Sequence, residues 1–97
     1  MKKILITRKL IKDCEDKASK IFDAKLNSND ELYSQKKLIE LSSGFDGILT
    51  SLTDKMDADT INALPETIKI ISNFAVGFGN IDLEAAKKRN IAVTLSL

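Results

Sequence analysis

The stretch of residues 68–82 constrains the fold of this chain more than any other part of the sequence. It begins with Ile68, Ile70 and Ile71, a short apolar run of β-branched side chains, and Pro65 ends the segment before it. Such a run is typical of a strand that is buried on both faces, as the strands of parallel sheets are. The stretch therefore predicts a buried strand of a parallel sheet.

A glycine turn and a helix start follow this strand. Gly77 and Gly79 leave the backbone free to adopt a positive φ and to approach a ligand closely, and Asp82 opens a helical pattern. The N–H groups of a glycine turn and of a helix N-terminus favour a carboxylate or a phosphate without any charged side chain. The sequence thus predicts an anion site here, with a plain tight connection between strand and helix as the alternative.

A dinucleotide-binding fingerprint is a sharper interpretation of these glycines, and two observations argue against it. Asp82 stands where the third glycine belongs, and that position requires a tiny residue for helix–strand packing. The fingerprint also needs an acidic residue at the end of the next strand, whereas residues 91–94 are followed by Leu-Ser-Leu. We therefore expect no nucleotide at this loop.

Composition limits the chain to one ordinary globular domain. The 97 residues are 43% hydrophobic and 30% charged, with a net charge of +1, so we expect neither nucleic acid nor a membrane as a partner. Met1 leads directly into a strand-like run, which excludes a secretory signal. The single cysteine fits a cytoplasmic location, and the absence of histidine argues against a histidine-rich metal site.

Strand-like and helix-like apolar patterns alternate along the chain, which indicates βαβ units. Five short strands joined by right-handed crossovers predict an α/β fold of the flavodoxin-like type, with three layers and a parallel sheet of order 2-1-3-4-5. This single domain covers residues 1–97. The expected strands are residues 4–6, 24–26, 47–50, the run that begins at Ile68, and 91–94.

Capping residues mark the ends of the expected helices. Ser34, Asp57 and Asp82 suit the N-caps of the last three, and the first carries an apolar stripe at helical spacing. Cys14 lies on that stripe, and we interpret it as a small buried hydrophobe rather than a nucleophile. The stripe consists of Leu10, Ile11, Cys14, Ala18, Ile21 and Phe22, and the residues suited to helix exits are Gly44 and Asn90.

Ligands of such sheets bind outside the carboxyl ends of the strands. Residues 7–9, 51–53 and 73–80 each follow a different strand and are expected along one edge. Arg8 is the only arginine there and could assist an anion, with an exposed arginine without a ligand as the alternative. A phospho-acceptor receiver domain shares this topology and is an alternative. Such a domain needs acidic residues after its first strand and at the end of its third, where this chain has threonine, arginine and serine, so we reject it.

Four segments of the sequence, in this order, resemble the D-2-hydroxyacid dehydrogenases, and they are most similar to the glyoxylate/hydroxypyruvate reductase branch. These segments are residues 4–8, 46–55, 70–82 and 85–94. The resemblance covers nearly the whole chain but only the first part of a family member. It implies a substrate-binding domain that closes over a separate nicotinamide-binding domain, and that second domain is absent from this sequence.

The resemblance also implies the site residues. The backbone amides of Val76 and Gly77 would hold the carboxylate of a small 2-oxo or 2-hydroxy acid, and Leu52 would line the pocket from the neighbouring loop. The family's catalytic arginine, acidic residue and histidine, and its glycine-rich cofactor loop, lie beyond the region covered here. No catalytic, cofactor-binding or metal-binding residue is therefore assigned in this chain.

The function implied by the resemblance is that of an oxidoreductase fragment. The parent enzyme would reduce a 2-oxo acid of the glyoxylate or hydroxypyruvate type with NAD(P)H, and this chain alone is expected to be inactive. Apolar surface that the missing domain and a returning C-terminal segment would cover is expected to favour a homo-oligomer. The alternative is a stand-alone module that binds a small carboxylate or a protein and has kept the fold without the chemistry.

Overall fold

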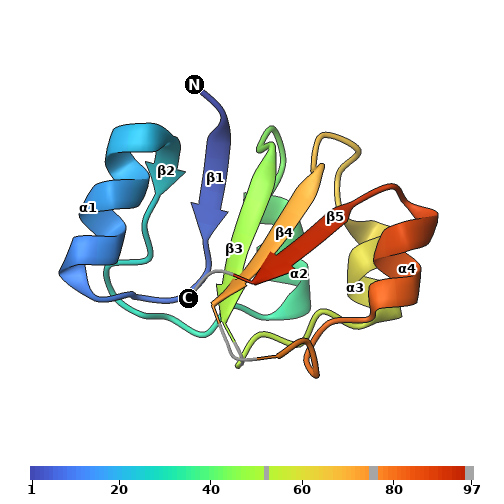
Figure 1. Cartoon of the computed structure of the whole chain (residues 1–97). Helices are drawn as coiled ribbons and strands as arrows, with labels where there is room; N and C mark the ends of the chain where they lie inside the picture. The colour runs from blue at the N-terminus through green and yellow to red at the C-terminus, as the bar shows by residue number, and fades with distance from the viewer. Residues whose placement is uncertain (52, 75–76, 96–97) are drawn as a thin grey trace.

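A parallel sheet with helices on both faces forms the centre of the computed structural model, which describes residues 1–51, 53–74 and 77–95 (Figure 1). The strand order is β2-β1-β3-β4-β5, and every neighbouring pair is parallel. The elements are β1 (Lys3–Ile6), α1 (Lys12–Ile21), β2 (Asp23–Lys25), α2 (Gln35–Leu41), β3 (Gly47–Ser51), α3 (Ala58–Ala63), β4 (Ile70–Phe74), α4 (Leu83–Lys88) and β5 (Ala92–Leu95). The predicted flavodoxin-like topology and strand order are confirmed.

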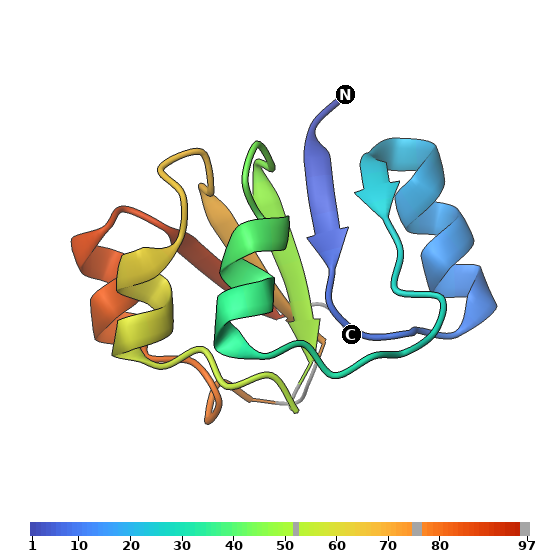
Figure 2. The same cartoon turned by 180° about the vertical axis from the view of Figure 1, so that it is seen from behind.

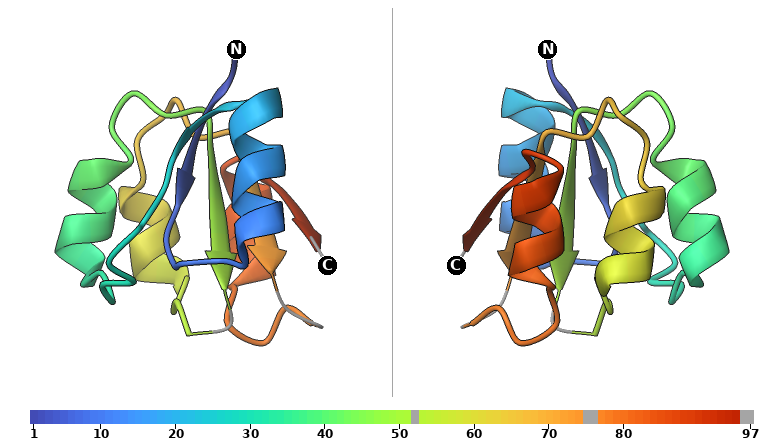
Figure 3. Two further views of the ribbon diagram at one scale, coloured as in Figure 1. Left: turned by 90° about the vertical axis from the view of Figure 1, so that its left-hand side faces the viewer. Right: turned by 90° about the vertical axis from the view of Figure 1, so that its right-hand side faces the viewer.

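The connections divide the helices between the two faces of the sheet. The chain moves one way from β1 through α1 to β2, then crosses back to β3 and continues in the other direction. Because each crossover between parallel strands is right-handed, the two directions place their helices on opposite faces. The helices α2, α3 and α4 cover one face, in front of the sheet in Figure 2, and α1 stands on the other face (Figure 3).

The hydrophobic core lies between the sheet and the three helices α2, α3 and α4. Leu5, Ile48 and Ile71 come from the three central strands and are at most 1% exposed. They occupy neighbouring positions of one face because the register pairs Leu5 with Ile48 and Ile48 with Ile71. The helices contribute Leu38, Ile61, Ala85 and Ala86 to the same cluster.

The capping residues act as predicted. The side chains of Ser34, Asp57 and Asp82 each accept a hydrogen bond from the backbone N–H three residues further on, which satisfies a donor that the helix itself cannot pair. Asn90 has a φ of 57° and turns the chain from α4 toward β5, while Gly44 has a φ of 81° after α2. These left-handed positions suit asparagine and glycine at helix exits.

The fourth strand differs from its prediction in two ways. It starts at Ile70, and Ile68 lies before it in a turn in which its N–H donates to the carbonyl of Pro65 at 3.2 Å. Ile68 nevertheless packs in the core with 2% exposure, whereas Ile70 is 36% exposed. The expectation of a strand buried on both faces is therefore wrong at Ile70, because no described helix lies over that side of β4.

The first helix is also less buried than its apolar stripe indicates. None of its residues is fully buried, and Cys14 is only partly buried. Ile11 and Ile21 are 68% and 54% exposed, and the expectation of a buried Cys14 is met only in part. The described part of the chain contains no helix with both the length and the apolar character needed to cross a membrane.

Candidate functional site

Loops from the carboxyl ends of β1, β3 and β4 meet at one edge of the sheet, at the bottom of Figure 1. The Arg8 guanidinium donates to the Thr53 hydroxyl at 2.6 Å, which joins the loops after β1 and β3. The Asn80 side chain donates to the carbonyl of Asp54 at 2.8 Å, which joins the loops after β3 and β4. The prediction that these three segments share one edge is confirmed for the described residues.

The glycines of the loop after β4 leave open space at this edge. A Cβ atom added at Gly77 or Gly79 would meet no other atom within 4 Å, and both residues are exposed. Gly79 does not use the freedom for a positive φ that the sequence gives it, since Gly44 has the one positive φ recorded for the described glycines. Leu52 and Val76, the other two residues expected in the substrate site, lie outside the described residues.

The side-chain amides of Asn73 and Asn80 hold this loop in place through hydrogen bonds. Asn73 is fully buried at the end of β4, and its Nδ2 donates to the carbonyl of Gly77 and to Oδ1 of Asn80, both at 2.8 Å. Both asparagines lie in the segment expected along this edge, but the sequence predicted no role for either. The available signal was an amide side chain in a strand that begins with an apolar run, because a buried amide needs partners.

The helix start does not provide the anion site that the sequence predicts. The carboxylate of Asp82 accepts from the N–H of Ala85 at 3.0 Å, so a negative charge of the chain itself occupies the first turn of α4. A second anion at this place would be repelled by that carboxylate. The cap therefore argues against an anion at the start of α4, and the anion site of this loop stays a prediction that depends on the glycine turn.

The same carboxylate bears on the nicotinamide cofactor that the family resemblance implies. A dinucleotide places its pyrophosphate at a helix N-terminus after a glycine turn, and here that terminus is the Asp82-capped start of α4. The described residues therefore do not fit such a cofactor at this loop, in agreement with the sequence. The described residues also contain no group of three or more side chains suited to hold a metal ion.

Arg8 is engaged by a carboxylate of the chain. Its Nε and Nη2 atoms donate to the two carboxylate oxygens of Asp30 at 2.7 and 3.1 Å, and the N–H of Lys9 donates to the same side chain at 2.9 Å. These hydrogen bonds lower the pKa of Asp30 to about 2. The guanidinium is thus paired at this edge, and the structure does not favour its use for a ligand anion.

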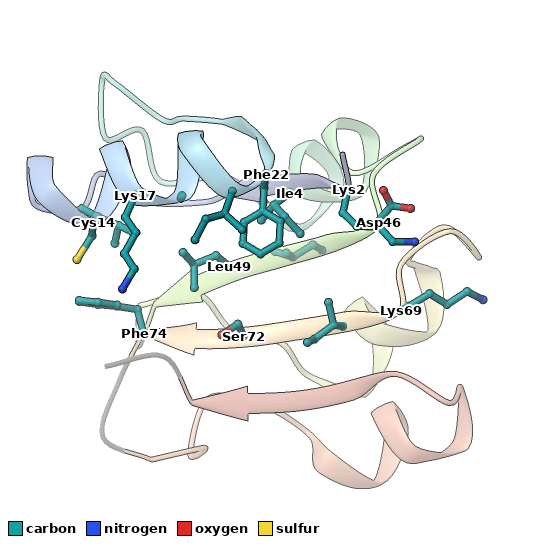
Figure 4. Close-up of a pocket in the computed structure, with 15 residues that line it drawn as sticks. Lys2, Ile4, Cys14, Lys17, Phe22, Asp46, Leu49, Lys69, Ser72 and Phe74 are labelled. Carbon is teal, nitrogen blue, oxygen red and sulfur yellow. The ribbon is translucent and has the colours of Figure 1, made fainter.

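A second opening lies on the face of the sheet that carries α1. It is an apolar groove of about 540 Å³ between α1 and the strands β1, β3 and β4 (Figure 4). We call it the α1 groove. Its apolar side chains include Ile4, Cys14, Phe22, Leu49, Ile70 and Phe74, and its charged ones are Lys2, Lys17, Lys69 and Asp46.

Comparison with known proteins connects this fold to one family. Residues 4–96 match the model of the D-isomer specific 2-hydroxyacid dehydrogenase catalytic domain. Among curated proteins, the glycerate dehydrogenase of Hyphomicrobium methylovorum is 36% identical over 92 residues, and the glyoxylate reductase of Thermococcus onnurineus is 33% identical over 92 residues. Each alignment covers 95% of this chain but only 29% and 27% of the relative, so the chain spans less than a third of their length.

Solved structures agree with the sequence comparison. A D-isomer specific 2-hydroxyacid dehydrogenase from a Polaromonas species superposes with a TM-score of 0.90 at 24% identity, covering 96% of this chain and 29% of that one. A protein of Pyrococcus horikoshii superposes with a TM-score of 0.84 at 32% identity, covering 99% and 28%. The chain belongs to the family of D-isomer specific 2-hydroxyacid dehydrogenases.

Proposed function

We propose that this chain is the substrate-binding domain of an oxidoreductase that reduces a 2-oxo acid of the glyoxylate or hydroxypyruvate type with NAD(P)H. The observation that carries the proposal is the family match over residues 4–96, with relatives named glycerate dehydrogenase and glyoxylate reductase. Both names refer to small acids that carry an oxygen on the carbon next to the carboxylate. A cytoplasmic location, favoured by the single cysteine, completes the proposal.

The role of this chain in the reaction is to bind and orient the acid. The carboxylate of the acid accepts hydrogen bonds from the backbone amides of Val76 and Gly77, and Leu52 contributes an apolar wall. The open space above Gly77 supports this assignment, because a ligand can approach the backbone there without meeting a side chain. The paired state of Arg8 supports it further, since recognition by backbone N–H groups needs no free arginine.

The chain by itself does not complete the reaction. Reduction of a carbonyl to a hydroxyl needs a hydride from the nicotinamide and a proton from an acidic group. The sequence has no histidine to deliver that proton, and the glycine loop does not fit the cofactor. The parts that supply both belong to a nicotinamide-binding domain, which acts together with this one.

Binding and turnover are tested separately. Amide NMR spectra of the isotope-labelled chain are recorded during a titration with glyoxylate or glycolate, and we expect a saturable shift of the Gly77 signal. Glycolamide, which lacks the negative charge, is the matched control and should leave the signal in place. A response to glycolamide as strong as to glycolate, or no response to either acid, contradicts the proposed site.

Turnover is measured as oxidation of NADH or NADPH in the presence of glyoxylate. We expect none from the chain alone. We expect it when the chain replaces the corresponding residues of the Hyphomicrobium glycerate dehydrogenase, because that protein then supplies the rest of the enzyme, of which this chain covers 29%. A chimera that folds and binds glyoxylate but never oxidises the cofactor would favour the stand-alone carboxylate-binding module instead.

Self-association is the second part of the proposal. The α1 groove offers apolar surface in one place, and contiguous apolar surface favours contact with a second copy. Three lysines surround the groove against one aspartate, so like charges oppose the contact. We therefore expect a weak homo-oligomer that becomes stronger as salt screens the lysines, and sedimentation at low and high ionic strength tests it.

A further inference from the structure

The amide side chains of Asn73 and Asn80 connect the two loops between which the substrate is proposed to bind. The Nδ2 atom of Asn80 donates to the carbonyl of Ser51 at 3.0 Å and to the carbonyl of Asp54 at 2.8 Å. The first carbonyl belongs to the last residue of β3 and the second to the loop after β3, on either side of residues 52 and 53. Asn80 itself belongs to the loop after β4, so one side chain holds both loops.

Asn73 continues the connection from the other side. Its Oδ1 accepts from the Thr50 hydroxyl at 3.0 Å, and its Nδ2 donates to Oδ1 of Asn80 and to the carbonyl of Gly77. The last of these bonds spans residues 75 and 76 and fixes the far side of the glycine turn. Glycine has more backbone freedom than any other residue. The hydrogen bond from Asn73 to the carbonyl of Gly77 therefore restricts the backbone at the residue that would otherwise be most mobile in this turn.

The pair has no unused hydrogen-bond donor. Each Nδ2 atom has two hydrogens, and each finds two carbonyl or amide oxygens within 3.0 Å. A carboxylate joins the pair to the third loop of the edge. Asp54 is 5% exposed, and its Oδ2 accepts from the N–H of Ser51 at 3.0 Å and from the hydroxyl of Thr7.

Backbone pairing reinforces the same junction. The N–H of Met56 donates to the carbonyl of Asn80 at 2.8 Å, and the N–H of Asp82 donates to the carbonyl of Met56 at 2.9 Å. The main chain of Asn80 is therefore fixed independently of its side chain. Loss of the Asn80 amide would release Ser51, Asp54 and Asn73 from it without separating the two loops.

From this arrangement we propose that Asn80, acting with Asn73, is a positioning residue that sets the distance and orientation between the loop after β3 and the glycine turn of the loop after β4. The inference rests on the proposed function, because it concerns the acid that binds between these loops. Neither asparagine touches the acid. Both act by holding Ser51 and Gly77, the described residues that flank the assigned site.

A filler role for Asn73 and Asn80 is the competing explanation. A buried position that needs only volume is filled by an apolar side chain, because an amide loses its hydration on burial and must regain every hydrogen bond within the protein. Asn73 is fully buried beside Ile71 in β4, and its partners are the two loops and Thr50 rather than the helices of the core. The hydrogen bonds thus run toward the candidate site and not toward the packed cluster.

The test compares Asn80→Asp and Asn80→Ala with Asn27→Ala. Asn80→Asp keeps size and one acceptor but loses the donor to Ser51 and Asp54. Asn27 is a control with the same bonding pattern, because its side chain, like that of Asn80, donates to two backbone carbonyls, here those of Thr7 and Glu31 at 2.8 Å, away from the glycine turn. Glyoxylate affinity is read from NMR signals of the folded population, so reduced stability alone does not change it.

Both Asn80 variants should bind glyoxylate about tenfold more weakly, and Asn27→Ala should bind within about twofold of the wild type. Equal weakening in all three variants, or wild-type affinity in Asn80→Asp, overturns the positioning role. If Asn80→Ala does not fold, Asn80→Asp decides the question.

A ligand-free measurement separates this inference from the proposed function. In the absence of any acid, Asn80→Asp should shift the Gly77 amide signal and the Asn73 side-chain amide signals, whereas Asn27→Ala should leave both in place. If the wild-type chain binds no glyoxylate, the proposed function fails, and the role of Asn80 in holding Gly77 is still decided by these signals. Unchanged Gly77 and Asn73 signals in Asn80→Asp contradict the inference whatever the chain binds.

Discussion

The two faces of the sheet are built from the same kinds of side chain but are filled to different degrees. On the face that carries α2, α3 and α4, Leu5, Ile48 and Ile71 are at most 1% exposed. On the face that carries α1, Ile6 is fully buried, but Ile70 is 36% exposed two strands away. One helix covers β1 and leaves β4 open. Apolar side chains in a strand therefore indicate that burial is favourable, but they do not indicate which element buries them.

The largest effect should come from the filled face. Ile71→Ala removes a fully buried side chain from the core and should lower the free energy of unfolding by about 2–5 kcal/mol. Ile70→Ala changes the adjacent residue on the opposite face and should cost about 1 kcal/mol or less, because part of that side chain is already in water. Urea denaturation measures both, and equal losses would contradict the difference between the faces.

A crowded point on the α1 face provides the next test. A Cβ atom at Gly47 would lie 2.7 Å from Cγ2 of Ile70 and 3.0 Å from Cδ1 of Ile4. Gly47→Ala should therefore lower the free energy of unfolding by about 1–3 kcal/mol through overpacking. Ile70→Ala removes the nearest atom, so the double variant should regain part of this loss, and strictly additive losses would contradict the steric explanation.

The open part of the α1 face can be tested through self-association. Ile70→Lys adds a further positive charge to the lysines of the α1 groove and should weaken any oligomer about tenfold or more, which sedimentation velocity measures as a function of concentration. Ile11→Lys is the control, because Ile11 is exposed but does not line the groove. If both variants weaken association alike, the groove is not the contact surface.

The smallest effect is expected at the Arg8–Asp30 pair, which belongs to neither face. The folded pKa of Asp30 is lowered to about 2 from an ordinary value of 3.8. The pair therefore stabilises the fold at pH values above the ordinary pKa, and this contribution is lost as the pH falls toward the pKa of the folded state. The difference in stability between wild type and Asp30→Asn should be constant near neutral pH and shrink over that acidic interval. A difference that persists at the lowest pH would indicate a cause other than ionisation.

Local sequence patterns were sufficient for the helix caps, because each cap depends on a side chain and an N–H three residues away. The strand order was predictable because five strands with right-handed crossovers commonly adopt the flavodoxin-like order. The same reliance on neighbouring residues limited the prediction of the site. Asp82 predicts the start of α4 correctly, but its own carboxylate then occupies the helix end that was expected to bind an anion.

The remaining features depend on contacts between distant residues. Asn80 joins Ser51 and Asp54, which lie 29 and 26 residues earlier in the chain, and no local pattern encodes such bonds. The exposure of Ile70 depends equally on what lies above the sheet. The resemblance to a known family supplied Leu52, Val76 and Gly77 as site residues, and of these only Gly77 belongs to the described chain.

The position of Cys14 has a practical consequence. It is the only cysteine of the sequence, and its side chain lines the α1 groove from the helix side (Figure 4). Anything that fills the groove must shield this thiol from reagents in solution, and anything that leaves the groove must expose it again. The rate at which a thiol reagent labels the native chain is thus a direct reporter of groove occupancy, with no engineered label required.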